Sequence, residues 1–539
     1  MAYADRPSGL SEFAKYGFAD LTGTVGKLDQ LVKLVGDSGR SAVAALALSL
    51  DPDQALNGLL DLAERDRASA KKLLGKHDSA VRLCAILGAS KALTDFLRRV
   101  PEALTVFEKA HQIDLGPEAY RQAIVTSVEP ILRGNFETQE AWTTLRKAYR
   151  LELLKIAIFD LTSPEPEGAM PVVAAALADI AGGAIEAGLE VARAELLNSN
   201  DHGVFSPQEV AATRLTVMAM GKCGARELNY ISDVDVIYVA QSGDPEVENH
   251  RAVEVATKLA TRMMRAMDGS AGEPDLWQVD PNLRPEGKSG ALVRTLDSHV
   301  AYYDRWAESW EFQALLKARP IAGDLQLGQD YLDALSPKVW HSSGRENFVE
   351  SAQKMRERVM QFIPANEVNL EIKLGPGGLR DIEFTVQLLQ LVHGRTDDTI
   401  HQRDTLGALD ALTAAGYVGR YESAQFSKHY KFLRLLEHRI QLSDMRRTHL
   451  MPTSEAKLRP LARSLARKTT VEGLLSDWER VKVEVRALHQ KIFYRPLLSA
   501  AARLEDSSLE LSTTQVEDRL HAIGFKDASG AHKNIAALD

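Results

Sequence analysis

Strand-like patterning is confined to one short part of this 539-residue chain. Residues Arg214–Met220 and Val234–Ala240 are short runs rich in β-prone residues. Two further strands are expected at Leu276–Arg284 and Ala291–Thr295. Four short strands make only one small sheet, so most of the fold must be helical. The sequence therefore predicts an α+β fold that is predominantly α-helical, with a small mixed sheet flanked by helical domains.

Helical periodicity covers the chain on both sides of this part. Apolar residues recur at three- and four-residue spacing in Ala42–Leu50, Leu56–Leu62, Val81–Val100, Leu145–Leu161, Ala175–Leu197 and Val300–Ala318. The same pattern continues from 347 to about 500, interrupted by the turn Gly375–Gly378. We expect an N-terminal helical region at 1–199, a strand-containing domain at 200–335 and a helix bundle at 345–500. Residues 501–539 are polar and weakly patterned, as at the start of a further segment.

Composition excludes several classes of protein. The net charge is −9 and the pI about 5.9, whereas proteins that bind nucleic acids usually carry a basic surface, so no nucleic-acid partner is expected. Cys84 and Cys223 lie far apart, which argues against a disulfide framework and fits a reducing cytoplasm. The N-terminus lacks the pattern of a signal peptide, and no uninterrupted apolar stretch reaches about 18 residues. We therefore expect a cytoplasmic protein without a membrane span.

The most informative segment is Met220–Val239, with the sequence MGKCGARELNYISDVDVIYV. A glycine turn leaves one strand, and an Asp-x-Asp pair opens the next. Residues two apart in a strand share a face, so Asp233 and Asp235 should point the same way while Val234 enters the core. Neighbouring carboxylates repel each other unless a cation lies between them. Oxygen ligands of this kind suit Mg²⁺ or Mn²⁺.

A third carboxylate is needed to hold two metal ions for an in-line displacement, and Asp280 is the candidate. Arg284 follows four residues later, and a guanidinium is suited to bind phosphate with two hydrogen bonds. The turn adds further candidates for phosphate binding through backbone N–H groups and cations. These candidates are Gly221, Lys222, Gly224 and Arg226, with Ser232 beside the aspartates.

Each of these features alone has a simpler interpretation. Most Asp-x-Asp pairs are solvated strand ends, and most glycine turns are only turns. The combination is more specific, because the turn, the Ser-Asp-x-Asp run and the distant Asp-x-x-x-Arg fall on neighbouring predicted strands. Together they match the arrangement of the nucleotidyltransferase domain in DNA polymerase β-like enzymes.

The segment also resembles the glutamine synthetase adenylyltransferase family, whose signature is G-K-x-G-x-x-E-L-x-x-x-S-D-x-D. Other stretches resemble the same family in the same order, over about residues 80–500. They are LGASKALTDFLRRVP (Leu87–Pro101), VDPNLRPEGKSGALVRT (Val279–Thr295), WEFQALLKARPIAGD (Trp310–Asp324), IKLGPGGLRDIEFTVQLLQL (Ile372–Leu391) and YKFLRLLEHRIQL (Tyr430–Leu442). One departure is Cys223, where the family usually has Leu, and we interpret it as a packing change.

Members of this family are fusions of two related halves, and the N-terminal half removes AMP while the C-terminal half adds it. This sequence contains one catalytic segment. Asn229 and the run KARPIAGD resemble the removing half, since the adding half tends to have Gly at the position of Asn229. Residues 501–539 then resemble the start of a linker toward an absent second half.

The resemblance implies a reaction and its partners. Inorganic phosphate would attack the adenylyl-tyrosine of adenylylated glutamine synthetase, giving ADP and unmodified enzyme. Asp233, Asp235 and Asp280 would be the catalytic metal ligands for two Mg²⁺ ions, with Mn²⁺ as the alternative. Positioning and charge neutralisation supply most of the catalysis in such transfers. The nitrogen-regulatory PII protein is the implied partner, and glutamine the implied effector.

Two alternatives stay open. The chain could instead transfer AMP from ATP to glutamine synthetase, and the cosubstrate separates the two reactions. It could also be a module that senses PII or glutamine without chemistry. The three intact aspartates argue against that, since a module without chemistry would be free to lose them.

Several other polar or aromatic residues have competing interpretations. Lys373, Arg380, Asp381 and Glu383 could reach a nucleotide, but mutual pairing and capping of a helix start is the simpler explanation. His438 has no second ligand at metal spacing, which favours a structural role. Trp306 and Trp310, four apart, are expected in the core rather than against an adenine. Lys317 and Arg319 could face either phosphate or solvent.

Overall fold

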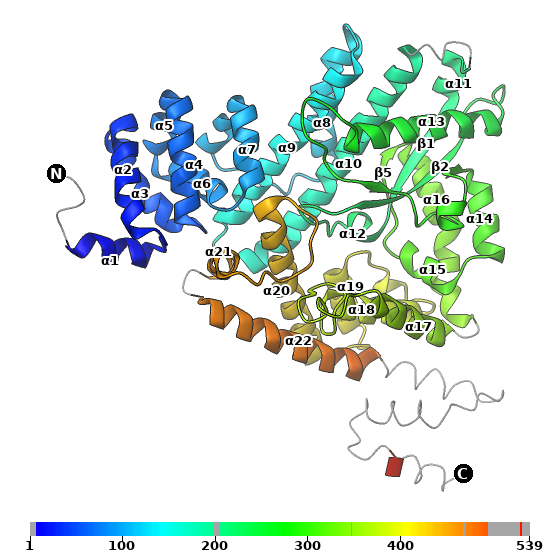
Figure 1. Ribbon diagram of the computed structural model, residues 1–539. Coiled ribbons are helices and arrows are strands. Elements are labelled where there is room, and N and C mark those ends of the chain that lie inside the picture. Colours follow the sequence, from blue (N-terminus) through cyan, green and yellow to red (C-terminus); the bar gives the residue numbers. More distant parts are fainter. Residues whose placement is uncertain (1–6, 199–203, 346–347, 467–468, 494–528, 531–539) are drawn as a thin grey trace. The chain divides into compact units, whose positions relative to one another are not determined.

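The computed structural model describes residues 7–198, 204–345, 348–466, 469–493 and 529–530. It is predominantly helical with one small mixed sheet, as the sequence predicted (Figure 1). The chain forms two compact units. The first unit contains Met1–Arg305, Lys317–Ala334 and Arg434–Leu474, and the second contains Trp306–Leu316, Leu335–Leu433 and Leu475–Asp539. The segments predicted at 1–199 and 200–335 thus share most of one unit, while 345–500 is divided between both. The predicted linker at 501–539 lies outside the described residues, apart from 529–530.

The first unit begins with a run of short helices. They are α1 (Pro7–Tyr16), α2 (Leu21–Val35), α3 (Asp37–Leu48), α4 (Pro52–Arg65), α5 (Arg67–Leu74), α6 (His77–Leu87), α7 (Lys91–Arg99), α8 (Pro117–Arg133) and α9 (Thr138–Thr162), with the 3₁₀ helix η2 (Pro101–Glu108) after α7. Side-chain caps define several starts: Asp51 accepts from the Gln54 N–H, and Ser90 accepts from the Leu93 N–H. The helix predicted at 81–100 is therefore two helices, because Ser90 starts a new one.

Helix α10 (Pro166–Asn198) is the alanine-rich helix predicted from the sequence, and it starts earlier than predicted. Its small residues let neighbours approach closely. A Cβ on Gly183 would lie 2.9 Å from the Tyr120 carbonyl oxygen, and one on Gly188 would lie 2.9 Å from the Met267 side chain. Among the described residues, α10 alone is long and apolar enough to cross a membrane by length and composition. However, 78% of its most apolar window is buried inside the protein, as in a core helix.

The sheet has the order β3-β2-β1-β5, and β4 also pairs with β2. The strands are β1 (Thr213–Ala219), β2 (Val234–Ser242), β3 (Val279–Asp280), β4 (Val293–Arg294) and β5 (Arg319–Gly323). β1 is antiparallel to β2 and β5, whereas β2 is parallel to β3 and β4. The two central strands, β1 and β2, are almost wholly buried, so their sequences are nearly continuous apolar runs. Their predicted ranges are therefore close to the observed ones.

The other strands differ from the predictions. β3 and β4 are only two residues long, because each covers a different part of the same edge of β2. β5 lies outside 214–295, where all strand signals were expected. Its sequence, Arg-Pro-Ile-Ala-Gly, gives a weak strand signal. Pro320 is tolerated because β5 lies at the edge of the sheet and its pairing shifts register next to this residue.

Further helices pack around the sheet in the first unit (Figure 1). They are α11 (Pro207–Ala212), α13 (Asn249–Asp268), α14 (Leu296–Arg305) and the first part of α16 (Leu325–His341). A short 3₁₀ turn, η3 (Gly287–Ser289), lies between β3 and β4 in the chain. α13 packs on β1 and β2, and α10 packs on β5. One hydrophobic core joins the N-terminal helices to the sheet.

The helix predicted at 300–318 is two helices, α14 and α15 (Ser309–Leu315). Glu308 starts the second through a capping box with Glu311. The expectation that Trp306 lies in the core on one helix with Trp310 is therefore wrong. Trp306 lies in the turn between the helices and is 71% exposed.

The second unit is a group of helices. It contains α15, α17 (Phe348–Gln361), α18 (Leu379–His393) and α19 (Thr405–Ala414), with parts of α16, α20 (Arg420–Asp444) and α22 (Val471–Phe493). The 3₁₀ turns η4 (Ser342–Gly344) and η5 (Asp398–Ile400) also belong to it, whereas α21 (Glu455–Leu465) belongs to the first unit.

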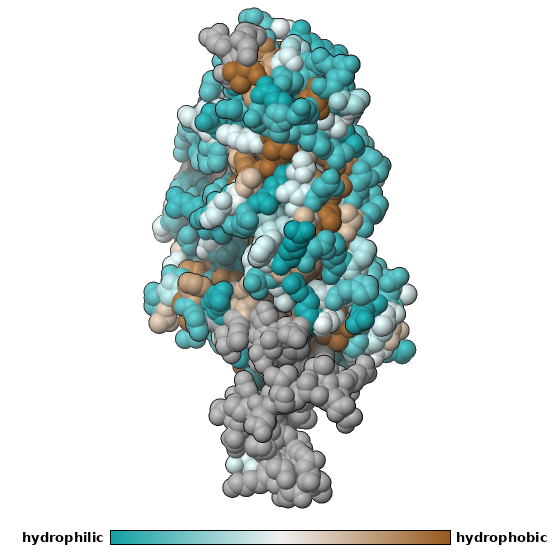
Figure 2. Space-filling view, turned by 90° about the vertical axis from the view of Figure 1, so that its right-hand side faces the viewer, coloured by the Kyte–Doolittle hydropathy of each residue, from teal (hydrophilic) through white to brown (hydrophobic). Residues whose placement is uncertain are grey.

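The face of the molecule in Figure 2 is mostly hydrophilic, with hydrophobic residues in small groups.

Two adjacent glycines of α10 provide a test of its packing. Gly183→Ala should lower the free energy of unfolding by about 1–3 kcal/mol, because the new Cβ meets backbone atoms at 2.9–3.2 Å. Gly182→Ala is the matched control: its Cβ would meet Ile321 at 3.5 Å, an ordinary contact, and alanine favours a helix by up to about 1 kcal/mol. Urea unfolding of both variants measures the difference. Equal stability of the two variants would contradict the close approach of α8 and α10.

Candidate active site

The three predicted metal ligands lie at one edge of the sheet. β2 and β3 run parallel with Val234 opposite Val279 and Asp235 opposite Asp280. Asp233 comes one residue before β2, and all three carboxylate residues are half-buried. Pairing of the strands therefore brings Asp235 and Asp280 side by side from positions 45 residues apart in the chain.

The glycine turn after β1 is the short helix α12 (Gly221–Gly224). The N–H of Met220 donates to the carbonyl of Asp235 at 2.8 Å, which places the turn against the start of β2. Gly221 has a φ of 52°, and a Cβ there would lie 2.9 Å from Oδ2 of Asp235. A Cβ on Gly224 would lie 1.9 Å from the Lys317 carbonyl oxygen. Gly221 thus requires glycine for its conformation, and Gly224 requires it because a neighbouring backbone approaches closely.

The donor set suits a hard divalent cation, because it consists of carboxylate oxygens at facing positions. These carboxylates already have other contacts. Asp280 accepts the Asn282 N–H at 2.8 Å, and Asp233 forms an ion pair with Arg447. Within the part of the chain that the structure describes, no three His, Cys, Asp or Glu side chains are grouped as a metal site. The carboxylates are close in the fold but do not form a closed cage.

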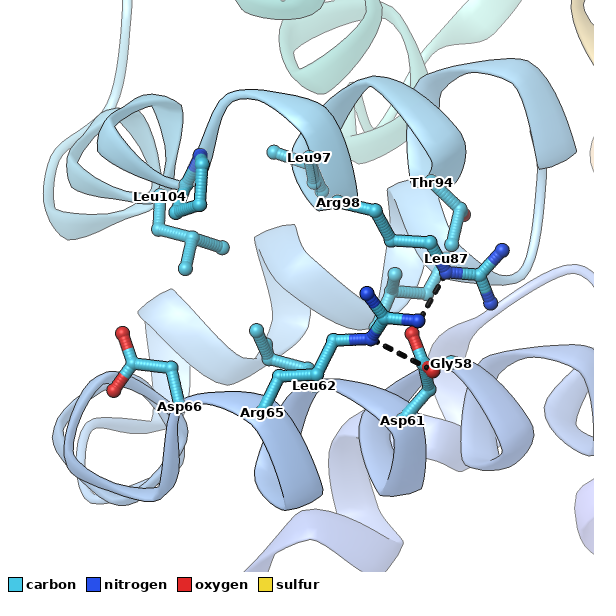
Figure 3. A pocket seen from close by; sticks show the side chains of 11 residues that line it. Gly58, Asp61, Leu62, Arg65, Asp66, Leu87, Thr94, Leu97, Arg98 and Leu104 are labelled. Atoms are coloured by element: carbon cyan, nitrogen blue, oxygen red, sulfur yellow. Dashed lines mark hydrogen bonds and ion pairs between the residues drawn. The ribbon is translucent and has the colours of Figure 1, made fainter.

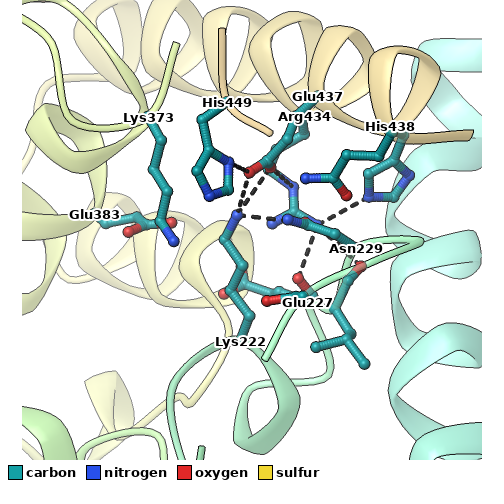
Figure 4. A network of polar contacts seen from close by, with 12 residues as sticks. Lys222, Glu227, Asn229, Lys373, Glu383, Arg434, Glu437, His438 and His449 are labelled. Atoms are coloured by element: carbon teal, nitrogen blue, oxygen red, sulfur yellow. Dashed lines mark hydrogen bonds and ion pairs between the residues drawn. The ribbon is translucent and has the colours of Figure 1, made fainter. Parts of the chain in front are cut away.

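Lys222, predicted to bind phosphate, lies in a buried ion pair (Figure 4). Its Nζ donates to both carboxylate oxygens of Glu437 at 2.9 and 2.8 Å and to Oδ1 of Asn229 at 3.3 Å. Burial by itself raises the pKa of Glu437, but Lys222, His449 and Arg434 outweigh it and hold that pKa well below its usual value. The lysine therefore neutralises a buried carboxylate beneath the turn.

The other predicted phosphate-binding side chains also have protein partners. Arg226, with a φ of 56°, binds Asp179 through Nε at 3.1 Å and a terminal nitrogen at 2.6 Å. The Ser232 hydroxyl donates to the Asp233 carbonyl at 3.0 Å. Arg284 donates to three backbone carbonyls of its own loop, those of Pro281, Lys288 and Gly290. The phosphate roles of these residues stay predictions, since each would have to exchange or share its partner.

The part of α20 that belongs to the first unit carries a row of buried polar residues. Arg434 donates to the carbonyls of Glu227 and Leu228 and to Nε2 of His438. Burial and Arg434 lower the pKa of His438 to about 3, so its imidazole is neutral. His438 also packs edge-on against Tyr230, with ring centroids 5.5 Å apart. These contacts give His438 the structural role expected from its sequence context.

Arg439 extends the same row to α9. Its guanidinium pairs with both carboxylate oxygens of Asp160, which also accepts the Tyr230 hydroxyl at 2.7 Å. Burial acts to raise the pKa of Asp160, but Arg439 outweighs it and the pKa is lowered. A helix more than 270 residues later in the chain is thus bound to α9 through a fully paired carboxylate.

Lys317 and Arg319 face neither open solvent nor an evident phosphate position. Lys317 is 7% exposed, and its Nζ binds Glu227 at 2.7 Å. Arg319 donates to the carbonyls of Cys223 and Gly224, each at 3.0 Å. Both side chains therefore support the turn Gly221–Gly224.

In the second unit, the simpler interpretation of the residues around the GPGG turn is confirmed in part: Arg380 and Glu383 pair with each other, whereas Asp381 pairs with Arg356. Arg380 lies 3.4 Å from Glu383. Asp381 accepts the Gly377 N–H at 2.7 Å and forms an ion pair with Arg356. These bonds stabilise the start of α18.

A separate cavity of about 280 Å³ lies among the N-terminal helices α4, α6 and α7 (Figure 3). Four leucines and several charged residues line it. Asp61 lies beside it and pairs with Arg65 at 3.0 Å and with Arg98 at 2.7 Å. Because these charges satisfy one another, the cavity does not present a ready site for an ionic ligand.

Sequence reasoning missed Glu437 and Arg447. Glu437 lies within the family-like run YKFLRLLEHRIQL, where charged residues alternate with apolar ones on all sides of a helix, and Arg447 follows that run. That composition could have indicated a helix buried all round, in which Arg434, Glu437 and Arg439 must find partners. Nothing in the sequence distinguishes Arg447 from its neighbour Arg446.

Two family models match the chain. Residues 80–334 match glutamate-ammonia ligase adenylyltransferase, and residues 347–493 match GlnD PII-uridylyltransferase. A protein of Leifsonia xyli named bifunctional glutamine synthetase adenylyltransferase/adenylyl-removing enzyme is 49% identical over 98% of this chain and 53% of its own length. Proteins of the same name from Streptomyces coelicolor and Cutibacterium acnes are 46% and 43% identical over 99% and 90% of this chain, and 52% and 49% of their own lengths. The chain thus spans about half the length of the curated relatives that it matches.

The buried Lys222–Glu437 pair can be tested by a double-mutant cycle. Lys222→Met should cost about 3–5 kcal/mol of unfolding free energy, since it leaves the Glu437 carboxylate buried without its lysine. Lys222→Met combined with Glu437→Gln should cost less than the sum of the single changes. Lys457→Met is the control: this lysine is 61% exposed and pairs with Asp444, so its loss should cost about 1 kcal/mol or less. Equal costs for both lysines would contradict the burial of the pair.

His438 predicts a pH dependence of stability. Its pKa is about 3 in the folded chain and about 6.5 when unfolded, so only the unfolded state takes up a proton between these values. Stability should therefore fall as the pH drops below about 6.5, by up to roughly 1.4 kcal/mol per pH unit from this group. Unfolding from pH 7 to 5 should show a shallower slope in His438→Gln than in the native chain. The exposed His77→Gln should keep the native slope, and an unchanged slope in His438→Gln would show that this histidine is not buried as a neutral group.

Proposed function

We propose that this chain is the adenylyl-removing part of a bifunctional glutamine synthetase adenylyltransferase/adenylyl-removing enzyme. Its substrate would be adenylylated glutamine synthetase, which it would deadenylylate by metal-dependent phosphorolysis to give ADP. The observation that carries the proposal is the register of β2 and β3, which sets Asp235 beside Asp280 with Asp233 one residue away. This supports a nucleotidyltransferase domain of the DNA polymerase β-like type.

The proposed mechanism assigns most of the polar residues a supporting role. Two Mg²⁺ ions, or Mn²⁺, bound by the three aspartates would neutralise charge on the reacting phosphates. Gly221 lets the backbone pass directly over Asp235. The Lys222–Glu437 and Lys317–Glu227 pairs hold the turn in place. Positioned carboxylates and a rigid turn are what an in-line transfer requires.

The direction of the reaction rests on the resemblance of Asn229 and KARPIAGD to the removing half. Asn229 is 2% exposed, and its Oδ1 accepts from Lys222. A glycine there would remove this acceptor from beneath the turn. Asn229 thus contacts the network that supports the site.

The proposed setting is control of nitrogen assimilation in the cytoplasm. The match of residues 347–493 to GlnD PII-uridylyltransferase supports the nitrogen-regulatory PII protein as a partner. Glutamine is proposed as an effector. Cys84 and Cys223 are both buried and free, and burial raises the pKa of each thiol to about 12.

Incubation with adenylylated glutamine synthetase, Mg²⁺ and phosphate should release ADP, and ATP should not label the unmodified substrate. Asp235→Asn should lower the rate at least about 100-fold without lowering the melting temperature, since it removes a charged ligand and leaves the packing intact. Asp333→Asn makes the same change on the exposed surface of α16 and should keep the rate. AMP transfer from ATP in place of ADP release would reverse the direction, and near-normal activity of Asp235→Asn would exclude the metal site.

A further inference from the structure

Arg447 contacts a carboxylate that the proposed function assigns to a metal ion. Its guanidinium forms an ion pair with Oδ2 of Asp233. Arg447 comes from the segment Arg434–Leu474, 214 residues after Asp233 and outside the sheet. No sequence motif pointed to it.

The loop that carries Arg447 is anchored at several points. Met445 has a φ of 47° and turns the chain at the end of α20. The side chain of Gln441 bridges two elements: its Oε1 accepts the Ile231 N–H at 3.3 Å, and its Nε2 donates to the Thr448 carbonyl at 3.1 Å. Ile231 is two residues before Asp233, and Thr448 is next to Arg447. The arginine and the aspartate are therefore held together by a common residue.

A second anchor joins this loop to the support of the turn. His449 lies 3.0 Å from Glu437, the same carboxylate that binds Lys222. The loop Met445–Leu450 is thus connected to both the turn before the aspartates and the strand that carries them. Such anchoring is more than a surface ion pair needs, since exposed pairs contribute little to stability.

The ion pair between Arg447 and Asp233 can give way to other partners of each group. Arg447 is 57% exposed and Asp233 is 20% exposed, so water reaches both partners when they separate. A divalent cation and a guanidinium compete for the same carboxylate oxygens, because each neutralises the charge that attracts the other. A released guanidinium at this position suits a phosphate group, which it can bind with two hydrogen bonds.

We propose that Arg447 is an active-site residue that shares Asp233 with the divalent cation. It neutralises Asp233 before the cation binds, and afterwards it binds a phosphate group of the reacting molecules. This inference rests on the proposed metal site.

Titration of the full chain with Mn²⁺ alone, followed by the electron paramagnetic resonance of the free ion, tests the competition. Arg447→Gln should bind Mn²⁺ at least about threefold more tightly than the native chain. Arg447→Lys should remain close to the native affinity, because it keeps the competing charge. Arg446→Gln is the matched control: it removes the same charge from the neighbouring exposed position, so a general effect of net charge would appear in both glutamine variants.

Steady-state phosphorolysis provides a second readout. Arg447→Gln should raise the KM for phosphate about tenfold, the size expected for loss of a charged hydrogen bond. The variant would then bind the metal more tightly and phosphate more weakly, whereas structural damage would weaken both. An unchanged KM for phosphate would overturn the phosphate role.

The Mn²⁺ titration separates failure of this inference from failure of the metal site. Equal affinity in the native chain, Arg447→Gln and Arg446→Gln would overturn the competition while leaving the metal site in place. Absence of Mn²⁺ binding in every protein would overturn the metal site and the inference together. The titration does not depend on the direction of the reaction.

Discussion

The structure of the first unit depends on charges that are buried with their partners. The part of α20 from Arg434 onward is surrounded by protein, and a charge without a partner there would be very costly. Each charge is met by a specific group: Glu437 by Lys222, and Arg439 by Asp160. Apolar contacts would allow this helix several positions, whereas paired charges allow one. The loop between β1 and β2 is fixed by the same pairs.

This constraint changes how the candidate site is understood. Cations beside an Asp-x-Asp motif suggest phosphate binding, yet Lys222, Lys317 and Arg319 all hold the turn. What remains at the edge of the sheet is the group of three aspartates, and Arg447 pairs with one of them. The residues that hold the turn are thus different from the three aspartates. The turn can therefore stay rigid, because the residues that position it need not move during a transfer.

A second constraint is the close packing of α10 against its neighbours. Its alanines and glycines bring α8 and β5 within backbone contact, so a helix as apolar as a membrane span serves here as the centre of a folded core. The sheet is small, and it is stable because this helix and α13 bury β1, β2 and β5. Helix α10 also contacts the candidate site directly, since its Asp179 binds Arg226.

The sequence by itself determined the elements whose signal is local. Apolar periodicity gave α9 and α10, continuous β-prone runs gave β1 and β2, and the spacing of Asp233 and Asp235 gave two carboxylates beside a glycine turn. It missed β5, since Pro320 and Gly323 mask a strand that exists only by pairing with β1. Tertiary structure alone decided which charges meet, because the partners of a buried charge are set by packing between distant segments. For that reason the sequence does not show that Lys222 pairs with the buried Glu437. Nor does it show that Arg447, rather than its neighbour Arg446, forms the ion pair with Asp233.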